Sequence, residues 1–264
     1  MVQFSSAIKF NSTCVAALCL LSTTSIARAD DLTADQIAQR IVKGNGFTWE
    51  GAHTKLRMVL VDDKGARSER ALDVEGRRHA GQLESKVRFL SPDDIAGTGF
   101  LMIEKPSGGS EQYIYLPGLK RLRRINGRER EGSFMGSDFT YADLNRPEDK
   151  GAKQVKLPDE KIGSDDAYVL ETTSSSVEKS GYSKLDTWVR KKDFIPIRTR
   201  FYAPDGKLQK TLYVRKTRDI DGKPAVVEAL MKTESGHSTE LYVDDVQRRE
   251  DLPDDDFIPS ALER

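Results

Sequence analysis

The residue types most often used in catalysis and metal binding are scattered through this sequence. It contains three histidines, His53, His79 and His237, and no two of them have the spacing of zinc ligands. Ser176 and Lys179 are spaced like a serine–lysine nucleophile pair, but they lie in a serine-rich stretch without an accompanying KTG motif. We interpret the histidines as surface or strand-edge residues and the Ser–Lys spacing as coincidence.

Three acidic stretches offer carboxylates, and each has a structural interpretation. SPDD (Ser91–Asp94) is typical of a turn, and DIDGK (Asp219–Lys223) lacks most of an EF-hand loop. The C-terminal LPDDDFIPSALER (Leu252–Arg264) has three aspartates that could bind calcium. A capped terminal turn, docked by Phe257, Ile258 and Leu262, explains the same residues. We therefore predict no metal site.

The sequence also lacks a glycine-rich phosphate loop. KGNGF (Lys43–Phe47) follows a predicted helix rather than a strand, which is the wrong context for a dinucleotide site. A hydrolase using carboxylates such as Asp138 or Asp143 is the remaining enzymatic hypothesis. Because no catalytic set is recognisable, we predict a protein that is not an enzyme and needs no cofactor.

The first 29 residues have the pattern of a secretory signal peptide. Lys9 is followed by the short apolar run Cys14–Leu21 and then by the small-residue pattern ARA (Ala27–Ala29). We expect cleavage after Ala29, export to the periplasm, and one domain over residues 30–264. Both cysteines lie in the signal peptide, so the mature chain can form no disulfide. Its formal charge of about −2 gives no electrostatic reason to expect nucleic acid binding.

The mature chain opens with an amphipathic helix over Leu32–Gly44. Thr33 and Gln36 form a capping-box pattern at its start, and Gly44 is typical of a helix end. Ala34, Ile37, Ala38 and Ile41 fall on one face, which must pack against another element.

Almost all of the remaining sequence alternates between apolar and polar residues, as in antiparallel strands with one buried face. Strands are predicted around Leu56–Leu60, Glu69–Glu75, Leu83–Phe89, Gly99–Ile103, Glu111–Leu116, Arg121–Ile125, Asp166–Glu171, Ser183–Arg190, Ile195–Tyr202, Leu208–Lys216, Ala225–Thr233 and Ser238–Val246. About 10–12 such strands twist too strongly for one flat sheet. The fold class is therefore mainly β, a strongly curved antiparallel half-barrel whose concave face is covered by the N-terminal helix and short helices.

A curved sheet of this kind predicts either an apolar groove for a ligand or a concavity that the helix fills. The segment GSFMGSDFTYADL (Gly132–Leu144, the 132–144 segment) combines turn residues with Phe134, Met135, Phe139, Tyr141 and Leu144. Gly132 and Gly136 would allow turns, and Ser137 or Asp138 could cap a short helix. We predict that these five apolar side chains, with the strand residues Phe100, Met102 and Ile114, line the groove as a lid or as a fixed plug.

The charged run before that segment, Lys120–Glu131, is the candidate contact surface. Arg121, Arg123 and Arg124 could meet anionic headgroups or an acidic partner. A solvated strand face, balanced by Glu129 and Glu131, is the alternative.

Four sequence blocks resemble the outer-membrane lipoprotein-sorting-like family. They are VRFLSPDDIAGTGFLMIE (Val87–Glu104), YIYLPGLKRLRRI (Tyr113–Ile125), the 132–144 segment and DTWVRKKDFIPIR (Asp186–Arg198). The resemblance covers most of the mature chain. It implies the fold of the periplasmic carrier LolA and its receptor LolB, which is an open, curved half-barrel with helices over its mouth. It carries over no residue roles.

The resemblance also implies a function. We expect a soluble periplasmic carrier of lipid, lipoprotein acyl chains or another hydrophobic molecule, acting with an RND-type exporter or an outer-membrane acceptor and making transient contact with a membrane surface. The alternative hypothesis is a non-catalytic module that docks on an envelope export complex through residues 120–130. The sequence leaves the cargo, the direction of transfer, the partner and the oligomeric state open.

Overall fold

One antiparallel sheet of 13 strands organises the described part of the chain. The computed structural model describes residues 1, 32–43, 50–144, 151–175, 181–249 and 251–264. Residues 2–29 of the predicted signal peptide and the Ser176–Lys179 pair lie outside these residues. No helix within them is long and apolar enough to cross a membrane.

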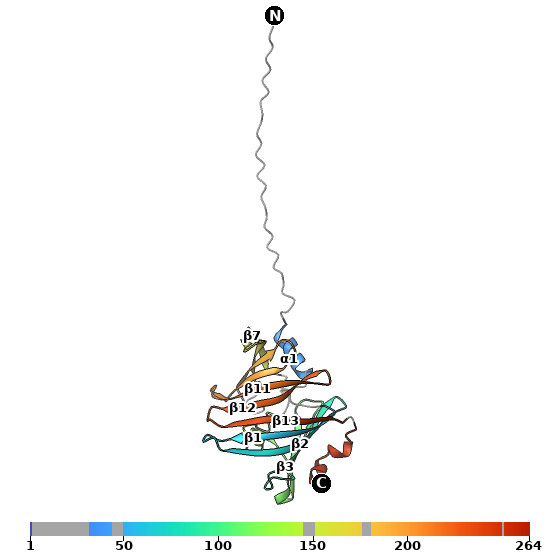
Figure 1. The fold of residues 1–264 in the computed structure, drawn as a ribbon. Coiled ribbons are helices and arrows are strands. Elements are labelled where there is room, and N and C mark those ends of the chain that lie inside the picture. The colour runs from blue at the N-terminus through green and yellow to red at the C-terminus, as the bar shows by residue number, and fades with distance from the viewer. Residues whose placement is uncertain (2–31, 44–49, 145–150, 176–180, 250) are drawn as a thin grey trace. The chain divides into compact units, whose positions relative to one another are not determined.

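The strands form two meanders that meet in the middle of the sheet. The first contains β1 (Ala52–Val61), β2 (Arg67–His79), β3 (Gln82–Ser91), β4 (Gly99–Glu104), β5 (Ser110–Leu116) and β6 (Arg121–Arg124). The second contains β7 (Lys153–Ile162), β8 (Asp165–Thr173), β9 (Lys184–Arg190), β10 (Pro196–Tyr202), β11 (Leu208–Ile220), β12 (Lys223–Thr233) and β13 (Ser238–Arg248). Pairing of β1 with β13 joins them, so the strand order runs from β6 at one edge to β7 at the other. Figure 1 shows β2, β1, β13, β12 and β11 side by side.

This architecture confirms the predicted curved antiparallel β fold. All twelve predicted strands are present, and β7 is the strand that the alternation did not reveal. The connection from β6 to β7 joins opposite edges of the sheet. The 132–144 segment belongs to that connection.

The N-terminal helix, α1 (Ala34–Lys43), forms as its capping residues predict. The Thr33 N–H donates to Gln36 Oε1 at 2.9 Å, and the Gln36 N–H donates to Thr33 Oγ1 at 3.2 Å. Ile37 is fully buried against Tyr168, Leu170 and Val189, with Ala34, Ala38 and Ile41 packed around it. The predicted apolar face of the helix is therefore the face that contacts the sheet.

Alternation along β9 places α1 on the same concave face as the 132–144 segment. Leu185 belongs to the apolar cluster around that segment, whereas Val189 belongs to the cluster around α1. Residues four apart in a strand point to the same face. The concave face consequently has two coverings, the helix over β8 and β9 and the segment over the first meander and part of the second.

The opposite face is covered at β4 to β6 by the C-terminal residues. They include the short 3-10 helices η3 (Asp254–Asp256) and η4 (Pro259–Glu263). Phe257 and Leu262 pack with Leu101, which points away from the concave face that its neighbour Phe100 lines. Gly99 permits this close approach, since a Cβ there would lie 3.0 Å from Leu262. The predicted docking by Phe257 and Leu262 is thus confirmed. The prediction was wrong for Ile258, which is 41 % exposed, and for the cap, because neither short helix has a side-chain cap.

Candidate functional site

A single large apolar cluster fills the concave face of the first meander and extends to the second. Its buried members come from strands on both sides of the β1–β13 junction, from the 132–144 segment and from two positions next to strands, Ile125 and Tyr182. They are Met58, Leu72, Leu83, Phe89, Phe100, Met102, Ile114, Ile125, Phe134, Phe139, Tyr141, Tyr182, Phe201 and Met231. Burial at this scale makes the cluster the main core of the sheet.

The 132–144 segment crosses this face as a compact turn structure rather than a helix. The 3-10 helix η2 (Gly127–Glu131) delivers the chain to it from β6. An isolated bridge pairs Ser133 with Thr140, and the Phe134 N–H donates to the Phe139 carbonyl at 2.7 Å. Gly136, with φ of 78°, makes the tight turn between them.

The aromatic side chains of the segment point into the sheet. The Phe134 ring centroid lies 5.3 Å from that of Phe100 and 5.5 Å from that of Tyr141, both in edge-to-face geometry. It also lies 5.8 Å from the Phe89 centroid. Phe134 is 2 % exposed, so this residue anchors the segment in the core.

Polar contacts fix the backbone of the segment to strands of both meanders. From the first meander, Arg70 of β2 donates to the Met135 carbonyl, and Gln112 Nε2 of β5 donates to the Tyr141 carbonyl at 2.7 Å. From the second, Thr239 Oγ1 of β13 accepts from the Asp138 N–H at 2.9 Å. The segment therefore links strands β2, β5 and β13 across the face.

A buried charge cluster forms a further contact between the segment and the strands. Lys210 Nζ of β11 lies 2.5 Å from Asp143 Oδ2 and 2.8 Å from the Asp138 carbonyl. The side chains of Lys210 and Asp143 are only 3 % and 4 % exposed. The Tyr182 hydroxyl donates to Asp143 Oδ1 at 2.8 Å, and its pKa is raised well above the usual range by burial and by the Asp143 charge.

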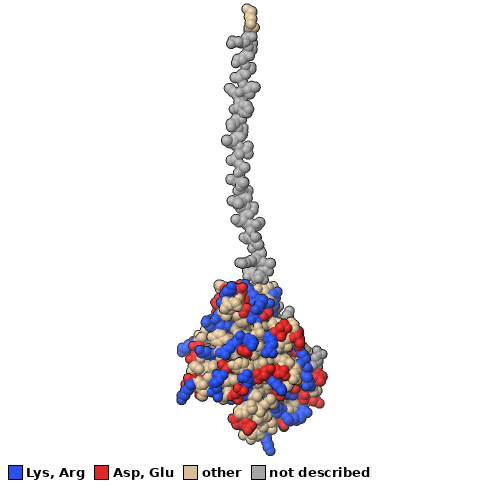
Figure 2. Space-filling view, viewed as in Figure 1, with Lys and Arg blue, Asp and Glu red and all other residues tan. Residues whose placement is uncertain are grey.

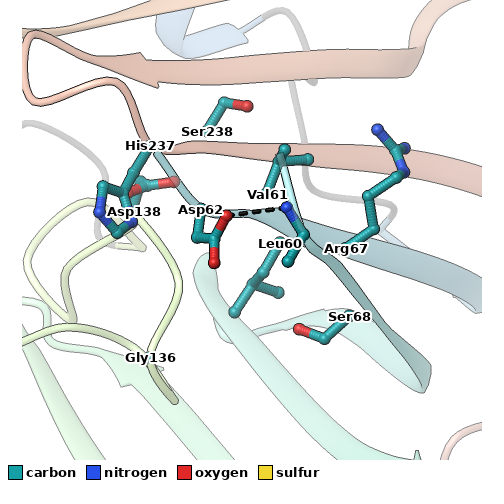
Figure 3. Close-up of a pocket in the computed structure, with 10 residues that line it drawn as sticks. Leu60, Val61, Asp62, Arg67, Ser68, Gly136, Asp138, His237 and Ser238 are labelled. Atoms are coloured by element: carbon teal, nitrogen blue, oxygen red, sulfur yellow. Dashed lines mark hydrogen bonds between the residues drawn. The ribbon is translucent and has the colours of Figure 1, made fainter. Parts of the chain in front are cut away.

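A pocket of about 300 Å³ opens beside the segment. Figure 3 shows it between the ends of β1 and β2, the turn before β13, and the loop that carries Gly136 and Asp138. Asp62, Arg67 and His237 contribute polar groups to its lining. At this pocket the edge of the 132–144 segment is accessible to solvent.

All eight predicted groove residues come together in the structure. Phe100, Met102, Ile114, Phe134, Phe139 and Tyr141 are buried in the main cluster, and Met135 and Leu144 pack against it half-buried. Whether they bind a ligand stays a prediction. Sequence reasoning missed the polar anchors Arg70, Gln112, Lys210 and Thr239, although each lies two positions before an apolar residue on the same strand face.

The predicted basic contact surface lies on the edge strand β6. Arg123 pairs with Glu129 at 2.5 Å, and Arg124 pairs with Glu111 at 2.8 Å, while Arg121 is exposed. Two of the three cations thus have neighbouring carboxylates, as the solvated-face alternative expects. Their contact with a partner or a headgroup remains a prediction.

The groups considered for catalysis have structural contacts in the fold. Asp143 is buried in its ion pair with Lys210, and Asp138 Oδ2 accepts from Thr239 Oγ1 at 2.7 Å. Within the described ranges, no group of three or more His, Cys, Asp or Glu side chains is arranged to hold a metal ion. The concave site is therefore an apolar surface, and hydrogen bonds and an ion pair hold the 132–144 segment over it.

The comparisons with known proteins point to one fold family. A family model described as "Uncharacterized protein" matches residues 81–264. The structure is similar to an outer membrane lipoprotein-sorting protein domain from Vibrio parahaemolyticus, with a TM-score of 0.80 and 31 % identity over 88 % of this chain and 98 % of that chain. The search of curated proteins found no match.

Two further solved structures share the fold. A DUF1329 family protein from Desulfovibrio piger has a TM-score of 0.79 and 24 % identity, over 86 % of this chain and 96 % of that chain. A LolA superfamily protein from Nitrosomonas europaea has a TM-score of 0.67 and 22 % identity, over 86 % of this chain and 98 % of that chain.

Proposed function

Because the chain belongs to the family of outer-membrane lipoprotein-sorting-like proteins and has a LolA-like fold, we propose that it is a non-catalytic carrier of a hydrophobic molecule in the periplasm. The cargo class is a lipid or the acyl chains of a lipidated protein. The cargo would occupy the concave face after the 132–144 segment has moved aside. Handover to an RND-type exporter or an outer-membrane acceptor is part of the same proposal.

The covering of the concave face is the observation that supports this proposal. The strands present a continuous apolar surface, and a turn structure outside the sheet covers it. Its contacts with the strands are side-chain packing, a few side-chain hydrogen bonds and the Lys210–Asp143 ion pair. Such a covering can separate from the sheet without breaking the strand pairing, so the sheet stays intact when the surface is uncovered.

The energetics require a long apolar cargo. Burying an acyl chain contributes about 0.8 kcal/mol per methylene, so about ten buried methylenes contribute about 8 kcal/mol. Uncovering three buried aromatic side chains costs roughly 1.5–3 kcal/mol each. One long chain can therefore replace the contacts of Phe134, Phe139 and Tyr141, whereas a short apolar molecule cannot.

A reversible disulfide tests whether the segment must move. Asp138 and Thr239 are in direct contact, and residues 30–264 contain no cysteine, so Asp138→Cys with Thr239→Cys creates one possible bridge. The matched control is Thr187→Cys with Thr199→Cys, which links β9 to β10 at directly opposed positions. Cargo capture is measured as phospholipid retained by the protein after mixing with detergent-dispersed lipid.

We expect the variant with Asp138→Cys and Thr239→Cys, once oxidised, to lose lipid capture and to regain it on reduction. The oxidised control should capture lipid as well as its reduced form does. Equal capture by the oxidised and reduced forms of the first variant would mean that the segment does not gate the concave face. Failure of the wild-type protein to retain any lipid class would contradict the carrier function itself.

The edge position of β6 supports a second candidate, a module that docks through residues 120–130. An edge strand leaves backbone groups available for a partner strand, and exposed Arg121 adds charge there. Replacing Arg121, Arg123 and Arg124 by Glu should then abolish co-purification of an envelope partner while lipid capture persists. Unchanged co-purification would remove this candidate.

A further inference from the structure

A second pocket, of about 370 Å³, lies in the second meander away from the 132–144 segment. Four cations, Arg190, Arg198, Arg215 and Lys216, line it together with one carboxylate, Asp165. Its remaining lining residues are Ile162, Ile197, Tyr213, Val214 and Thr217. The excess of positive charge distinguishes this pocket from the mixed charges beside the 132–144 segment.

Two of the strands that line this pocket are irregular at the lining residues. The pairing register shifts at Pro196/Arg198 in β10 and at Val214/Lys216 in β11. A β-bulge re-aims a side chain that regular pairing would direct elsewhere, and bulges are concentrated beside functional sites. Here Ile197 and Arg215 are the extra residues, and both line the pocket.

Arg198 is held in a fixed orientation and still has an unused hydrogen-bond donor. Its guanidinium lies 3.7 Å from the centroid of the Trp188 ring. Its Nη2 is 3.5 Å from Glu160 Oε2, but that same oxygen already accepts from the Trp188 indole N–H at 2.8 Å. Arg198 Nε is buried and has no hydrogen-bond partner among the described residues.

The more exposed cations of the pocket also have weak partners. Arg215 lies 3.4 Å from Glu240, and Lys216 lies 3.3 Å from Glu228. Strong charge-assisted hydrogen bonds are shorter, about 2.7–2.9 Å. By contrast, Arg190 lies 2.7 Å from Asp193 and has its partners in place. Burial and the charge of Arg200 lower the pKa of Arg198, which is the effect of positive charge without full compensation.

The chain around the pocket is strongly basic. Residues 189–218 contain ten Lys or Arg and two Asp, in a protein whose total formal charge is zero. Figure 2 shows Lys and Arg side chains gathered around β11 on the face in view. An anion approaching this part of the molecule would be attracted before it reached the pocket.

We propose that this pocket binds a phosphate-type anion, either the phosphate of a lipid headgroup or a soluble phosphate ester. Guanidinium groups match phosphate oxygens in charge and geometry. A pocket of this volume holds the phosphate together with part of the attached organic group. The site is separate from the proposed cargo surface, and the proposal does not depend on movement of the 132–144 segment.

The test compares two pairs of exposed cations in the full mature protein. Arg215→Gln with Lys216→Gln removes two charges from the pocket. Lys55→Gln with Arg249→Gln removes two exposed charges that do not line the pocket and is the matched control. Phosphate affinity is measured by calorimetric titration with sodium phosphate against sodium chloride of equal ionic strength. Arg198→Lys, which keeps the charge but loses Nε and the planar stack, is measured beside them.

We expect the pocket variant to bind phosphate about tenfold or more weakly than wild type, with the control unchanged and Arg198→Lys in between. Flotation with phosphatidylglycerol or phosphatidylcholine vesicles then identifies the source of the phosphate. Wild-type binding to phosphatidylglycerol alone, lost in the pocket variant, supports a lipid headgroup, and binding of free phosphate without vesicle binding supports a soluble ester. Absence of phosphate binding by wild type, or an equal loss in the control, would overturn the proposal.

Discussion

The two coverings of the concave face are held in different ways. Helix α1 packs through Ile37 on Tyr168, Leu170 and Val189, and the hydrogen bonds of its capping box stay within its own N-terminus. The 132–144 segment also buries apolar side chains, but Arg70, Lys210 and other polar groups of the strands bond directly to it. Apolar packing is non-directional, whereas these bonds require one position.

The difference suggests different roles for the two coverings. The apolar contacts of the helix weaken gradually when the helix shifts along the sheet. We therefore expect α1 to behave as an ordinary part of the core. The segment has one closed position with a charge pair at its centre, so it is suited to discrete closed and open states. Variants that damage one covering and spare the other can test this distinction.

The largest effect should come from the buried ion pair. Lys210→Met keeps the length of the side chain but leaves the Asp143 carboxylate buried without its cation. Breaking a buried pair in this way costs about 3–5 kcal/mol. We expect that loss in the free energy of unfolding, measured by urea denaturation at pH 7, and faster hydrogen exchange in the 132–144 segment than in α1.

The double variant Lys210→Met with Asp143→Asn is the control for this experiment. The substituted asparagine side chain carries no charge and still accepts a hydrogen bond, so the double variant should be more stable than Lys210→Met alone. A single variant within about 1 kcal/mol of wild type would mean that the pair is open to water and does not seal the segment.

A cavity beneath α1 should lower the free energy of unfolding by less, and it should loosen only the helix. Ile37→Ala removes a fully buried side chain, for which losses of about 2–4 kcal/mol are usual. We expect faster hydrogen exchange in α1 with unchanged exchange in the 132–144 segment. Gln39→Ala, at an exposed position of the same helix, should leave both unchanged. Equal loosening of both coverings by Ile37→Ala would show that they act as one unit.

Alternation and capping predicted most of the fold, and the exceptions have physical causes. Thr33, Gln36 and the apolar face of α1 determine the helix locally. Strand β7 was missed because it is an edge strand with mostly exposed or half-buried residues and with Pro158 inside it. Proline and charge are tolerated at an edge, and the same residues hide the alternation that identifies a strand.

The candidate sites were predictable to different degrees. Turn residues combined with aromatic ones predicted that the 132–144 segment covers the sheet. One of its polar anchors could have been recognised from the sequence. Lys210 shares a strand face with Leu212 and Val214, and a cation on an apolar strand face indicates a buried partner. For the basic pocket, the only signal was the density of Lys and Arg in residues 189–218. Bulges change which side chains face it, and no local pattern fixes where a bulge forms.

The prediction with the smallest expected effect tests the hydroxyl of Tyr182. Its pKa is raised by burial and by the Asp143 charge, so the folded state keeps the proton that the unfolded chain releases near pH 10. The stabilisation from this group is therefore complete below pH 10 and is lost as the pH rises toward the folded pKa. Tyr182→Phe should cost about 1 kcal/mol at pH 7, the value of one hydrogen bond.

Above pH 10 the difference between wild type and Tyr182→Phe should shrink by about 1.4 kcal/mol per pH unit, since phenylalanine has no proton to lose. Urea denaturation at intervals between pH 8 and pH 11 measures this slope. Tyr213→Phe removes a tyrosine that is 37 % exposed and should run parallel to wild type. If Tyr182→Phe also runs parallel to wild type, water reaches the hydroxyl, and the charge cluster does not seal the segment against the sheet.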